Sequence, residues 1–337
     1  MISKTSILEK RLVQDMITGK YPVGTPIPSR NRLATKYGCS RTTVERAIDS
    51  LTANGYLRSV KGSGTYVASI HPDHKITSIR FVAGYYGSRP VDFFSELVLS
   101  GDPFEYPITW FNERESAERF EQLAMPGGAV IWMLPGEEQL FIMDALRDKR
   151  IPQLLFNRQY RNYDCVFTDP VSSIREGLAW LLIEGGRDIA FISRTCSVER
   201  PYLHHRIIAF YEQAIAFGAH MRGDWIFSRD FLDIPHEIEE IAGKLFSGNH
   251  PRGIFVMNFE LVLPLVMAAQ HYKKKLGKDY FLLTFDSVAE LVNTPGVGML
   301  CQPYKQFRQE MHRWLASGAA QNGQVFSVAL KCDFQHW

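Results

Sequence analysis

Four residues near the N-terminus have side chains that can hydrogen-bond the edges of nucleic acid bases: Arg41, Thr42, Thr43 and Arg46. They follow Ser40, a preferred N-cap residue, and the apolar residues after them recur at helical spacing, at Val44, Ala47, Ile48 and Leu51. At about 100° per residue, Thr42 and Arg46 point most nearly away from this apolar face, and Arg41 lies at the helix tip. The spacing predicts a helix that ends at Asn54-Gly55 and presents its N-terminal residues to the major groove of DNA.

A second helix is predicted just upstream, because Ser29 can cap a short helix that carries Leu33 and Ala34 and closes at Tyr37-Gly38. Two helices joined by so short a turn form a helix-turn-helix. Before them, apolar residues at helical spacing predict a further helix that Gly19 stops, at Leu8, Leu12, Val13, Met16 and Ile17. The segment 21–29 contains too many Pro and Gly residues for regular structure.

A β-hairpin is predicted directly after the helix-turn-helix. Residues 56–60 and 65–68 have strand-like composition and flank a short basic turn made of Lys61, Gly62, Ser63 and Gly64. Because this turn has almost no bulky side chains, it can approach the phosphate backbone or enter the minor groove closely.

The basic residues of the chain are concentrated in this region. Residues 1–69 contain eleven Lys and Arg residues against four Asp and Glu residues, a formal charge of +7. Since the whole chain of 337 residues carries +2, the remainder carries −5. This distribution is expected when only one part of a protein touches a polyanion. The length indicates about two domains, and a hydrophobic content of 45% is sufficient for packed cores.

Several classes of protein are excluded by the same sequence. No apolar run reaches the length of a membrane span, and the N-terminus lacks the apolar stretch of a signal peptide. The five cysteines are odd in number, widely spaced and never arranged as C-x-x-C, which argues against a disulfide framework or a structural zinc site. We therefore expect a cytoplasmic protein without metal, cofactor or membrane contact.

The first seventy residues resemble the winged-helix domain of GntR-family transcription regulators. The resemblance is carried by Gly19-x-Tyr21, Pro28-Ser29, Leu33-Ala34, Ser40-Arg41-x-Thr43-Val44 and Gly62-x-Gly64-Thr65. In that family the Arg after the capping Ser contacts the operator, as do the glycines of the hairpin turn, which is called the wing. The resemblance therefore implicates Arg41, Gly62 and Gly64. Two further arginines of the family pattern are displaced here, onto Arg30 or Arg32 and onto Arg46. The predicted DNA-binding residues are Arg30, Arg32, Ser40, Arg41, Thr42, Thr43, Arg46, Lys61, Gly62, Ser63 and Gly64. The alternative is a helix-turn-helix used for protein contacts.

Beyond a polar linker at 70–75, short apolar runs alternate with amphipathic segments, which predicts parallel sheets with helices on both faces. The fold class is therefore α/β, a winged helix-turn-helix (1–69) followed by a body of two lobes (76–337). The first lobe is predicted to contain about 76–186 and 290–318, and the second about 187–289 and 319–337.

Polar and aromatic residues follow most of the predicted strands, where ligands bind in parallel sheets. Asn157-Arg158, Asp169, Arg194, Asn258, Asp286 and Gln302 all stand directly after strands, and Tyr85 and Phe93 follow the first strand. Such side chains offer donors, acceptors and flat apolar faces to a polyhydroxylated ligand. Strand ends are also often polar for capping, so each residue alone is a weak signal.

The body also resembles the effector domain of LacI/GalR regulators, which is itself like periplasmic sugar-binding proteins. The best-matching segments are Asn157-Arg158, Gly185–Ile192, Arg206–Phe210, Pro251–Asn258, Phe285-Asp286 and Gln302-Pro303. The resemblance implies that Arg206 and Asp286 grip sugar hydroxyls, with Asn258 and Gln302 beside them and Phe231 as a stacking ring. The predicted effector-binding residues are Tyr85, Phe93, Asn157, Asp169, Arg194, Arg206, Phe231, Asn258, Asp286 and Gln302. Arg194 replaces a usual glycine and Phe259 a usual aspartate, which suggests a ligand with an anionic group.

A GntR-type head on a LacI-type body resembles the arabinose-responsive repressors of Gram-positive bacteria. The resemblance implies a homodimer that binds a palindromic double-stranded operator. It also implies that a small sugar-like effector, bound between the lobes, controls this binding. Three alternatives stay open: an enzyme built on the α/β body, an all-helical metal-binding body, and a body that only dimerises or senses a non-sugar ligand. The first lacks G-x-G-x-x-G, Gly-Lys-Ser/Thr and G-x-S-x-G motifs.

Overall fold

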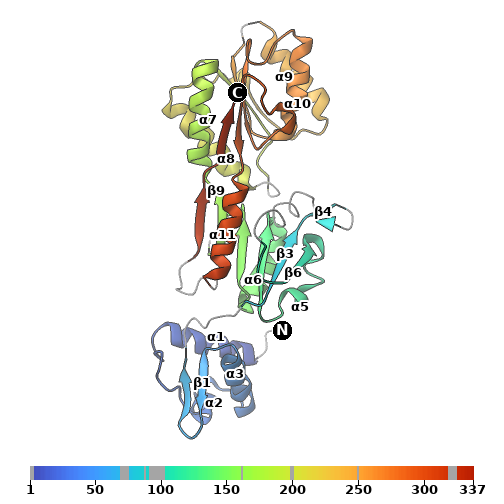
Figure 1. Ribbon diagram of the computed structural model, residues 1–337. Helices are drawn as coiled ribbons and strands as arrows, with labels where there is room; N and C mark the ends of the chain where they lie inside the picture. The colour runs from blue at the N-terminus through green and yellow to red at the C-terminus, as the bar shows by residue number, and fades with distance from the viewer. Residues whose placement is uncertain are drawn as a thin grey trace.

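The computed structural model describes residues 4–68, 76–86, 89–90, 103–160, 162–197, 201–248, 250–317 and 325–337. The chain forms an N-terminal head and a body of two lobes, with the head beside the first lobe (Figure 1). The head and both lobes have separate hydrophobic cores, and each lobe has a core on either face of its sheet.

The head contains the predicted helices and hairpin: α1 (Lys4–Ile17), α2 (Arg30–Tyr37), α3 (Arg41–Ala53), β1 (Leu57–Val60) and β2 (Gly64–Val67). The hydroxyl of Ser40 accepts a hydrogen bond from the Thr43 amide at 3.1 Å, so it caps α3 as the sequence predicts. Gly38 ends α2 in the left-handed conformation, at φ 61°. The segment between α1 and α2 is irregular, and its Ile27 amide donates to the Thr65 carbonyl of β2.

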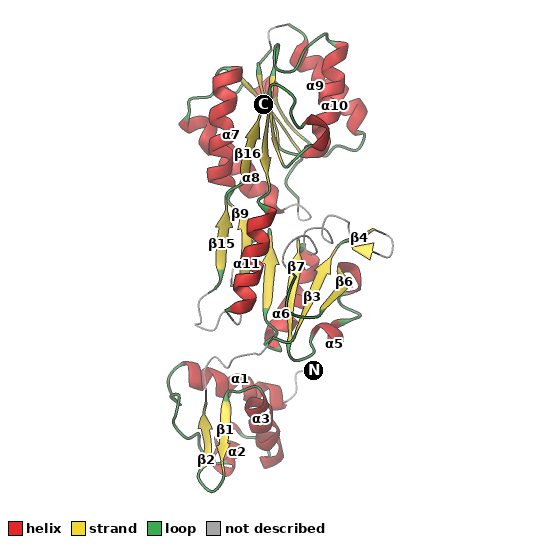
Figure 2. Ribbon diagram, viewed as in Figure 1, coloured by secondary structure: helices red, strands yellow, loops and turns green. Residues whose placement is uncertain are grey.

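Lobe 1 is a six-stranded sheet in the order β15-β9-β8-β7-β3-β6 (Figure 2). All neighbours in it are parallel: β3 (Ser78–Ala83), β6 (Ile108–Asn112), β7 (Gly128–Met133), β8 (Gln153–Phe156), β9 (Asp164–Thr168) and β15 (Ser327–Leu330). One face is covered by α11 (Tyr304–Ala316), and the other by α5 (Phe120–Leu123) and α6 (Leu140–Asp148). A small hairpin of β4 (Tyr85–Tyr86) and β5 (Arg89–Pro90) follows β3.

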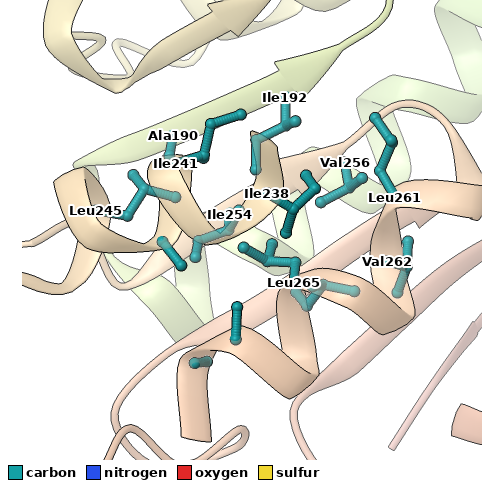
Figure 3. Close-up of a cluster of buried hydrophobic side chains, with 14 of the residues drawn as sticks. Ala190, Ile192, Ile238, Ile241, Leu245, Ile254, Val256, Leu261, Val262 and Leu265 are labelled. Atoms are coloured by element: carbon teal, nitrogen blue, oxygen red, sulfur yellow. The ribbon is translucent and has the colours of Figure 1, made fainter. Parts of the chain in front are cut away.

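Lobe 2 is a second six-stranded sheet in the order β11-β10-β12-β13-β14-β16. Its strands are β10 (Ile189–Ser193), β11 (Ile226–Ser228), β12 (Gly253–Val256), β13 (Phe281–Phe285), β14 (Val297–Cys301) and the antiparallel β16 (Asp333–His336). The helices α7 (Pro170–Gly185) and α8 (Pro201–Ala216) cover one face, and α9 (Ile234–Phe246) and α10 (Val262–His271) cover the other. Figure 3 shows the core under α9 and α10, where Ile238, Ile241 and Leu265 meet the strand residues Ile192, Ile254 and Val256. Short 3-10 turns lie at Glu113–Glu115, Glu137–Gln139, Gly223–Trp225, Phe259–Leu261 and Ala289–Leu291.

The lobe boundaries predicted from the sequence are wrong in three places. The helix α7 packs on β12, β13 and β14 and belongs to lobe 2, as does β14 itself. The strand β15 pairs with β9 in lobe 1. The chain therefore crosses between lobes near 169, 302 and 331, and only the pairing of distant strands decides where these crossings fall.

Lobe 2 requires a glycine where α7 ends against β12. A Cβ atom added to Gly185 would lie 2.7 Å from the backbone of Gly253, which cannot yield as a flexible side chain can. We expect Gly185→Ala to lower the free energy of unfolding of the body by about 1–3 kcal/mol. Gly223→Ala is the matched control because a Cβ there meets nothing within 4 Å. Thermal unfolding of the two variants measures the difference, and equal melting temperatures would show that α7 shifts freely.

The head touches lobe 1 through side chains as well as through the linker. The Lys10 Nζ lies 2.6 Å from an Asp148 carboxylate oxygen at the end of α6. The guanidinium of Arg150 lies 4.3 Å from the centre of the Tyr56 ring, and Tyr56 is buried. These contacts set the orientation of the head against the end of lobe 1 that is farthest from lobe 2 (Figure 1).

Candidate functional site

The outward face of α3 carries the residues predicted to read base edges. Arg41, Thr42 and Arg46 are exposed, whereas the opposite face of the helix is buried against the rest of the head. The Arg41 Nε donates to a Glu45 carboxylate oxygen at 3.2 Å, an exposed pair that solvent and salt screen strongly. Ser40 and Thr43 form the cap at the helix start, where their hydroxyl oxygens lie 2.8 Å apart.

The turn between β1 and β2 has a backbone that depends on its glycines. Gly62 and Gly64 have φ values of 78° and 131°, in the region that favours glycine, and all four residues 61–64 are exposed. The Ser63 and Tyr66 hydroxyl oxygens lie 2.5 Å apart and brace the turn. Arg32 is exposed in the first turn of α2 and Arg30 is half-buried. The head therefore presents a basic helix tip and a basic, narrow wing.

A network in the head holds α1 against α2 behind this surface. The Tyr37 hydroxyl and the Lys36 ammonium donate to one Asp15 carboxylate oxygen at 2.6 and 2.9 Å. Burial raises the pKa of Asp15, but the hydrogen bonds from Tyr37, Lys20 and Lys36 outweigh it and lower that pKa to about 2. Lys36 is thus a structural residue, whereas Arg46 has its side chain free in solvent.

A cavity of about 780 Å³ opens between the lobes at the ends of their strands. Three of the predicted effector residues line it beside Asn157, namely Arg206, Asp286 and Gln302. The size is typical of a small-molecule site.

A chain of polar contacts joins these residues across the lobes. The Arg206 Nη1 lies 3.4 Å from an Asp286 carboxylate oxygen, and Gln302 Nε2 donates to the other oxygen at 2.5 Å. The Thr168 hydroxyl oxygen lies 2.5 Å from Gln302 Oε1 and 2.9 Å from Asn157 Oδ1. The guanidinium of Arg206 also lies 3.8 Å from the centre of the Phe285 ring. A ligand here would meet carboxylate, amide and guanidinium groups held in fixed positions.

The backbone at this edge of the sheets is unusual. Leu134, Asn157 and Asp286 follow β7, β8 and β13, and all three have positive φ, at 58°, 50° and 73°. Non-glycine residues adopt this conformation only when the surrounding structure requires it, and such residues cluster at binding sites. The three line the same cavity.

Four predicted effector residues do not line this cavity. The Asp169 carboxylate caps α7 by accepting from the Val171 and Ser172 amides, at 2.9 and 3.3 Å, and borders a neighbouring cavity of about 510 Å³. Arg194 is paired with Glu260 at 2.7 Å and also donates to the Phe231 carbonyl. The Asn258 side chain accepts from the Arg194 amide at 3.0 Å, and Phe231 is buried in the core of lobe 2. These four residues therefore have structural partners, and Asp169 shows that a polar residue after a strand can cap the next helix.

The prediction for Tyr85 and Phe93 is not tested by the structure. Tyr85 lies in β4 with its side chain outside the described part of the molecule, and Phe93 lies outside the described residues altogether.

Arg158, Tyr202 and Tyr304 also line the cavity, and the predicted set did not include them. The guanidinium of Arg158 lies 4.4 Å from the centre of the Tyr202 ring, and that of Arg206 lies 4.9 Å from it. The pKa of Arg158 is lowered to about 10, chiefly by burial, and the charge of the nearby Arg206 contributes in the same direction. The strand-end signal was present for Arg158, directly beside Asn157, whereas nothing in the sequence marks a tyrosine near the start of α8.

Other kinds of site are not seen in the described parts of the chain. No three His, Cys, Asp or Glu side chains there gather as a metal site. No helix among those residues is long and apolar enough to cross a membrane. The alternative of an all-helical body is wrong, because both lobes are built on six-stranded sheets.

Comparison with known proteins gives separate results for the head and the body. Residues 4–67 match the family model of bacterial regulatory proteins of the gntR family. The "Probable fructoselysine utilization operon transcriptional repressor" of Escherichia coli K12 is 32% identical over 143 residues, 40% of this chain and 53% of that protein. The mannosyl-D-glycerate transport/metabolism system repressor MngR of the same organism is 30% identical over 89 residues, 26% of this chain and 37% of MngR. The chain thus spans about half the length, or less, of these curated relatives.

Solved structures resemble the body in fold. A LacI family transcription regulator from Clostridium acetobutylicum superposes with a TM-score of 0.59 at 14% identity, covering 77% of this chain and 98% of that one. The transcription regulator CcpA of Lactococcus lactis superposes with a TM-score of 0.57 at 15% identity, covering 77% and 97%. These likenesses establish the two-lobed architecture of the body.

Proposed function

Because the chain joins a GntR-type winged helix to a body with the fold of LacI-type regulators, we propose that it is a transcriptional repressor controlled by a small carbohydrate-like effector. The head binds a DNA operator, and the effector binds between the lobes and changes the affinity of the head for that operator. The observation that carries this proposal is the polar network of Asn157, Gln302, Asp286 and Arg206, which spans both lobes at the cavity between them.

The head is suited to DNA by shape and charge. Its exposed helix tip and glycine wing lie on a module of formal charge +7, and phosphate contacts from such a surface supply much of the affinity of regulators for DNA. Arg41, Thr42 and Arg46 are assigned to base edges, with Ser40 and Thr43 at the helix start. Arg30, Arg32 and the wing residues 61–64 are assigned to the backbone and minor groove.

The body is suited to switching because its ligand residues come from two rigid units. A ligand held by Asn157 of lobe 1 and by Asp286 of lobe 2 binds more tightly when the lobes are closed, so it shifts the population toward the closed state.

The protein works as a homodimer on a palindromic operator in the cytoplasm, with no enzymatic activity. Two-fold symmetry of the protein then matches two-fold symmetry of the DNA.

Fluorescence anisotropy of labelled DNA from the protein's own promoter region, at fixed salt, tests the proposal. We expect tight binding that one member of a carbohydrate panel releases. Binding that no carbohydrate changes would support the alternative in which the body only dimerises or senses another ligand. No binding at low salt would reject the assignment of the head.

Replacement of Arg46 by Ala tests base reading by α3. We expect a loss of about 1–3 kcal/mol in operator binding and a relaxed preference at one operator position, because a bidentate contact to a base would be removed. Titration of single-base operator variants at several salt concentrations measures both effects. Arg187→Ala, an exposed site in lobe 2, is the matched control. Unchanged affinity and salt slope would remove Arg46 from the interface.

A further inference from the structure

The cavity between the lobes has an unbalanced charge. Among the described residues, its lining includes two arginines, Arg158 after β8 in lobe 1 and Arg206 on α8 in lobe 2, but only one carboxylate, that of Asp286. Both guanidinium groups lie against the same ring, Tyr202, so two positive charges from different lobes approach each other. Like charges at such a site repel unless an anion lies between them.

Asp286 is already committed to other partners. Its carboxylate oxygens accept from Gln302 and face Arg206, which leaves Arg158 without an ion pair among the described residues. The one hydrogen bond that Arg158 makes there is from Nη1 to the carbonyl of the preceding Asn157, at 2.8 Å. Its Nε–H is buried and has no hydrogen-bond partner in the described structure. A buried donor of this kind costs free energy, which a ligand acceptor would recover.

The neighbouring carboxylates in the described parts of the chain do not compensate Arg158. Asp169 and Glu212 border the adjacent cavity, but the Asp169 oxygens cap α7 and Glu212 is exposed to solvent. Glu260 is held by Arg194, which is the arginine that the sequence suggested as an anion ligand. The pairing of Arg194 removes it from that role, and Arg158 is instead the arginine of the cavity that has no carboxylate partner among the described residues.

We propose that the effector is an anionic carbohydrate, whose phosphate or carboxylate group binds between Arg158 and Arg206 while its hydroxyls meet Asn157, Asp286 and Gln302. This inference rests on the proposed function and specifies the ligand of the same cavity. The anion converts a repulsion between the lobes into an attraction, and charge-assisted hydrogen bonds from guanidinium to phosphate or carboxylate are short and strong. The neutral form of the same sugar lacks this group and leaves the lobes apart.

Isothermal titration calorimetry with matched ligands tests the inference. The probes are glucose, glucose 6-phosphate, gluconate, fructose, fructose 6-phosphate and inorganic phosphate, titrated into the full chain at fixed salt. We expect at least one anionic probe to bind at least tenfold more tightly than its neutral parent. Preference for phosphosugars identifies the group as phosphate, and preference for gluconate identifies it as carboxylate.

Two variants locate the anion in the cavity. Arg158→Gln is expected to weaken binding of the preferred anionic probe by about 10- to 100-fold, because a full charge and its hydrogen bonds are lost. Inorganic phosphate, titrated in the same way, is the reference anion. Arg158→Lys keeps the charge and is expected to restore part of the affinity. Arg222→Gln is the matched control, since Arg222 is an exposed arginine paired with Asp224 elsewhere in lobe 2.

The results separate this inference from the proposed function. Neutral sugars that bind as well as their anionic counterparts, or anions that bind Arg158→Gln unchanged, would overturn the inference and leave the repressor proposal standing. Failure of every anionic probe, inorganic phosphate included, to bind the wild-type chain would also overturn it. If the wild-type chain does not bind promoter DNA in the absence of ligand, the proposed function is rejected instead.

Discussion

Arg206→Met is expected to abolish the response of DNA binding to the effector while leaving operator affinity without effector unchanged. Arg206 is buried, pairs with Asp286 and lies over Phe285, so it contacts both the polar network of the cavity and an aromatic residue of the lobe 2 core. Met retains the length of the side chain and part of its packing but provides no donors. Two charge-assisted hydrogen bonds of about 1.5–3 kcal/mol each correspond to at least about 100-fold weaker effector binding.

Calorimetry and promoter anisotropy together measure the two halves of this expectation. Arg175→Met provides the control, because Arg175 is an exposed arginine on a helix of the same lobe. A circular dichroism melt excludes simple unfolding, since Asp286 loses its charged partner in the variant. If the Arg206→Met variant still releases DNA at the effector concentration that releases it from the wild-type chain, the effector does not bind at this cavity.

Leu51→Ala is expected to eliminate DNA binding and leave effector binding intact. Leu51 is fully buried in the core of the head, where it packs with Leu12, Leu33 and Val44. Truncation of a buried leucine costs about 2–5 kcal/mol, which approaches the whole stability of a domain as small as the head. The body has its own cores and does not depend on this residue.

Differential scanning calorimetry distinguishes the two units by the temperature at which each unfolds. We expect the transition of the head to move down or vanish in Leu51→Ala, and that of the body to stay in place. Val23→Ala is the control, since Val23 is an exposed apolar residue of the head, 53% accessible to solvent. Undiminished promoter binding by a chain whose head has melted would mean that another surface binds the DNA.

The helices and hairpin of the head could be predicted from sequence because its signals are local. The caps at Ser29 and Ser40, the left-handed Gly38 and the apolar spacing of α3 each act within one or two turns of the chain. The wing glycines likewise reflect a backbone requirement at their own positions, seen in the positive φ of Gly62 and Gly64.

The body could be predicted only in part, because its decisive contacts join distant segments. Alternating strands and helices indicated parallel sheets, but β15 pairs with a strand about 160 residues earlier, and no local pattern reveals such a partner. For the same reason the sequence misassigned α7 and β14 to the first lobe.

The residues that directly follow strands were predicted to bind the effector, and only some of them line the cavity between the lobes. Asn157, Asp286 and Gln302 follow strands and line the cavity, whereas Asp169 follows a strand and caps a helix instead. The two roles use the same residue types, so only the position of the neighbouring amides separates them. Arg194 differs again, because its partner Glu260 lies 66 residues away and could not be identified in advance.

The placement of the head on lobe 1 has a mechanical consequence. The Lys10–Asp148 and Tyr56–Arg150 contacts fasten the head at the far end of α6, and the cavity between the lobes lies toward the opposite end of lobe 1. Lobe 1 is therefore a lever whose fulcrum is the crossing between the lobes and whose long arm carries the head. In the homodimer that we propose, a rotation of lobe 1 by a few degrees about this crossing would displace α3 of each subunit by several ångströms, which is enough to misalign two recognition helices set one helical turn of DNA apart.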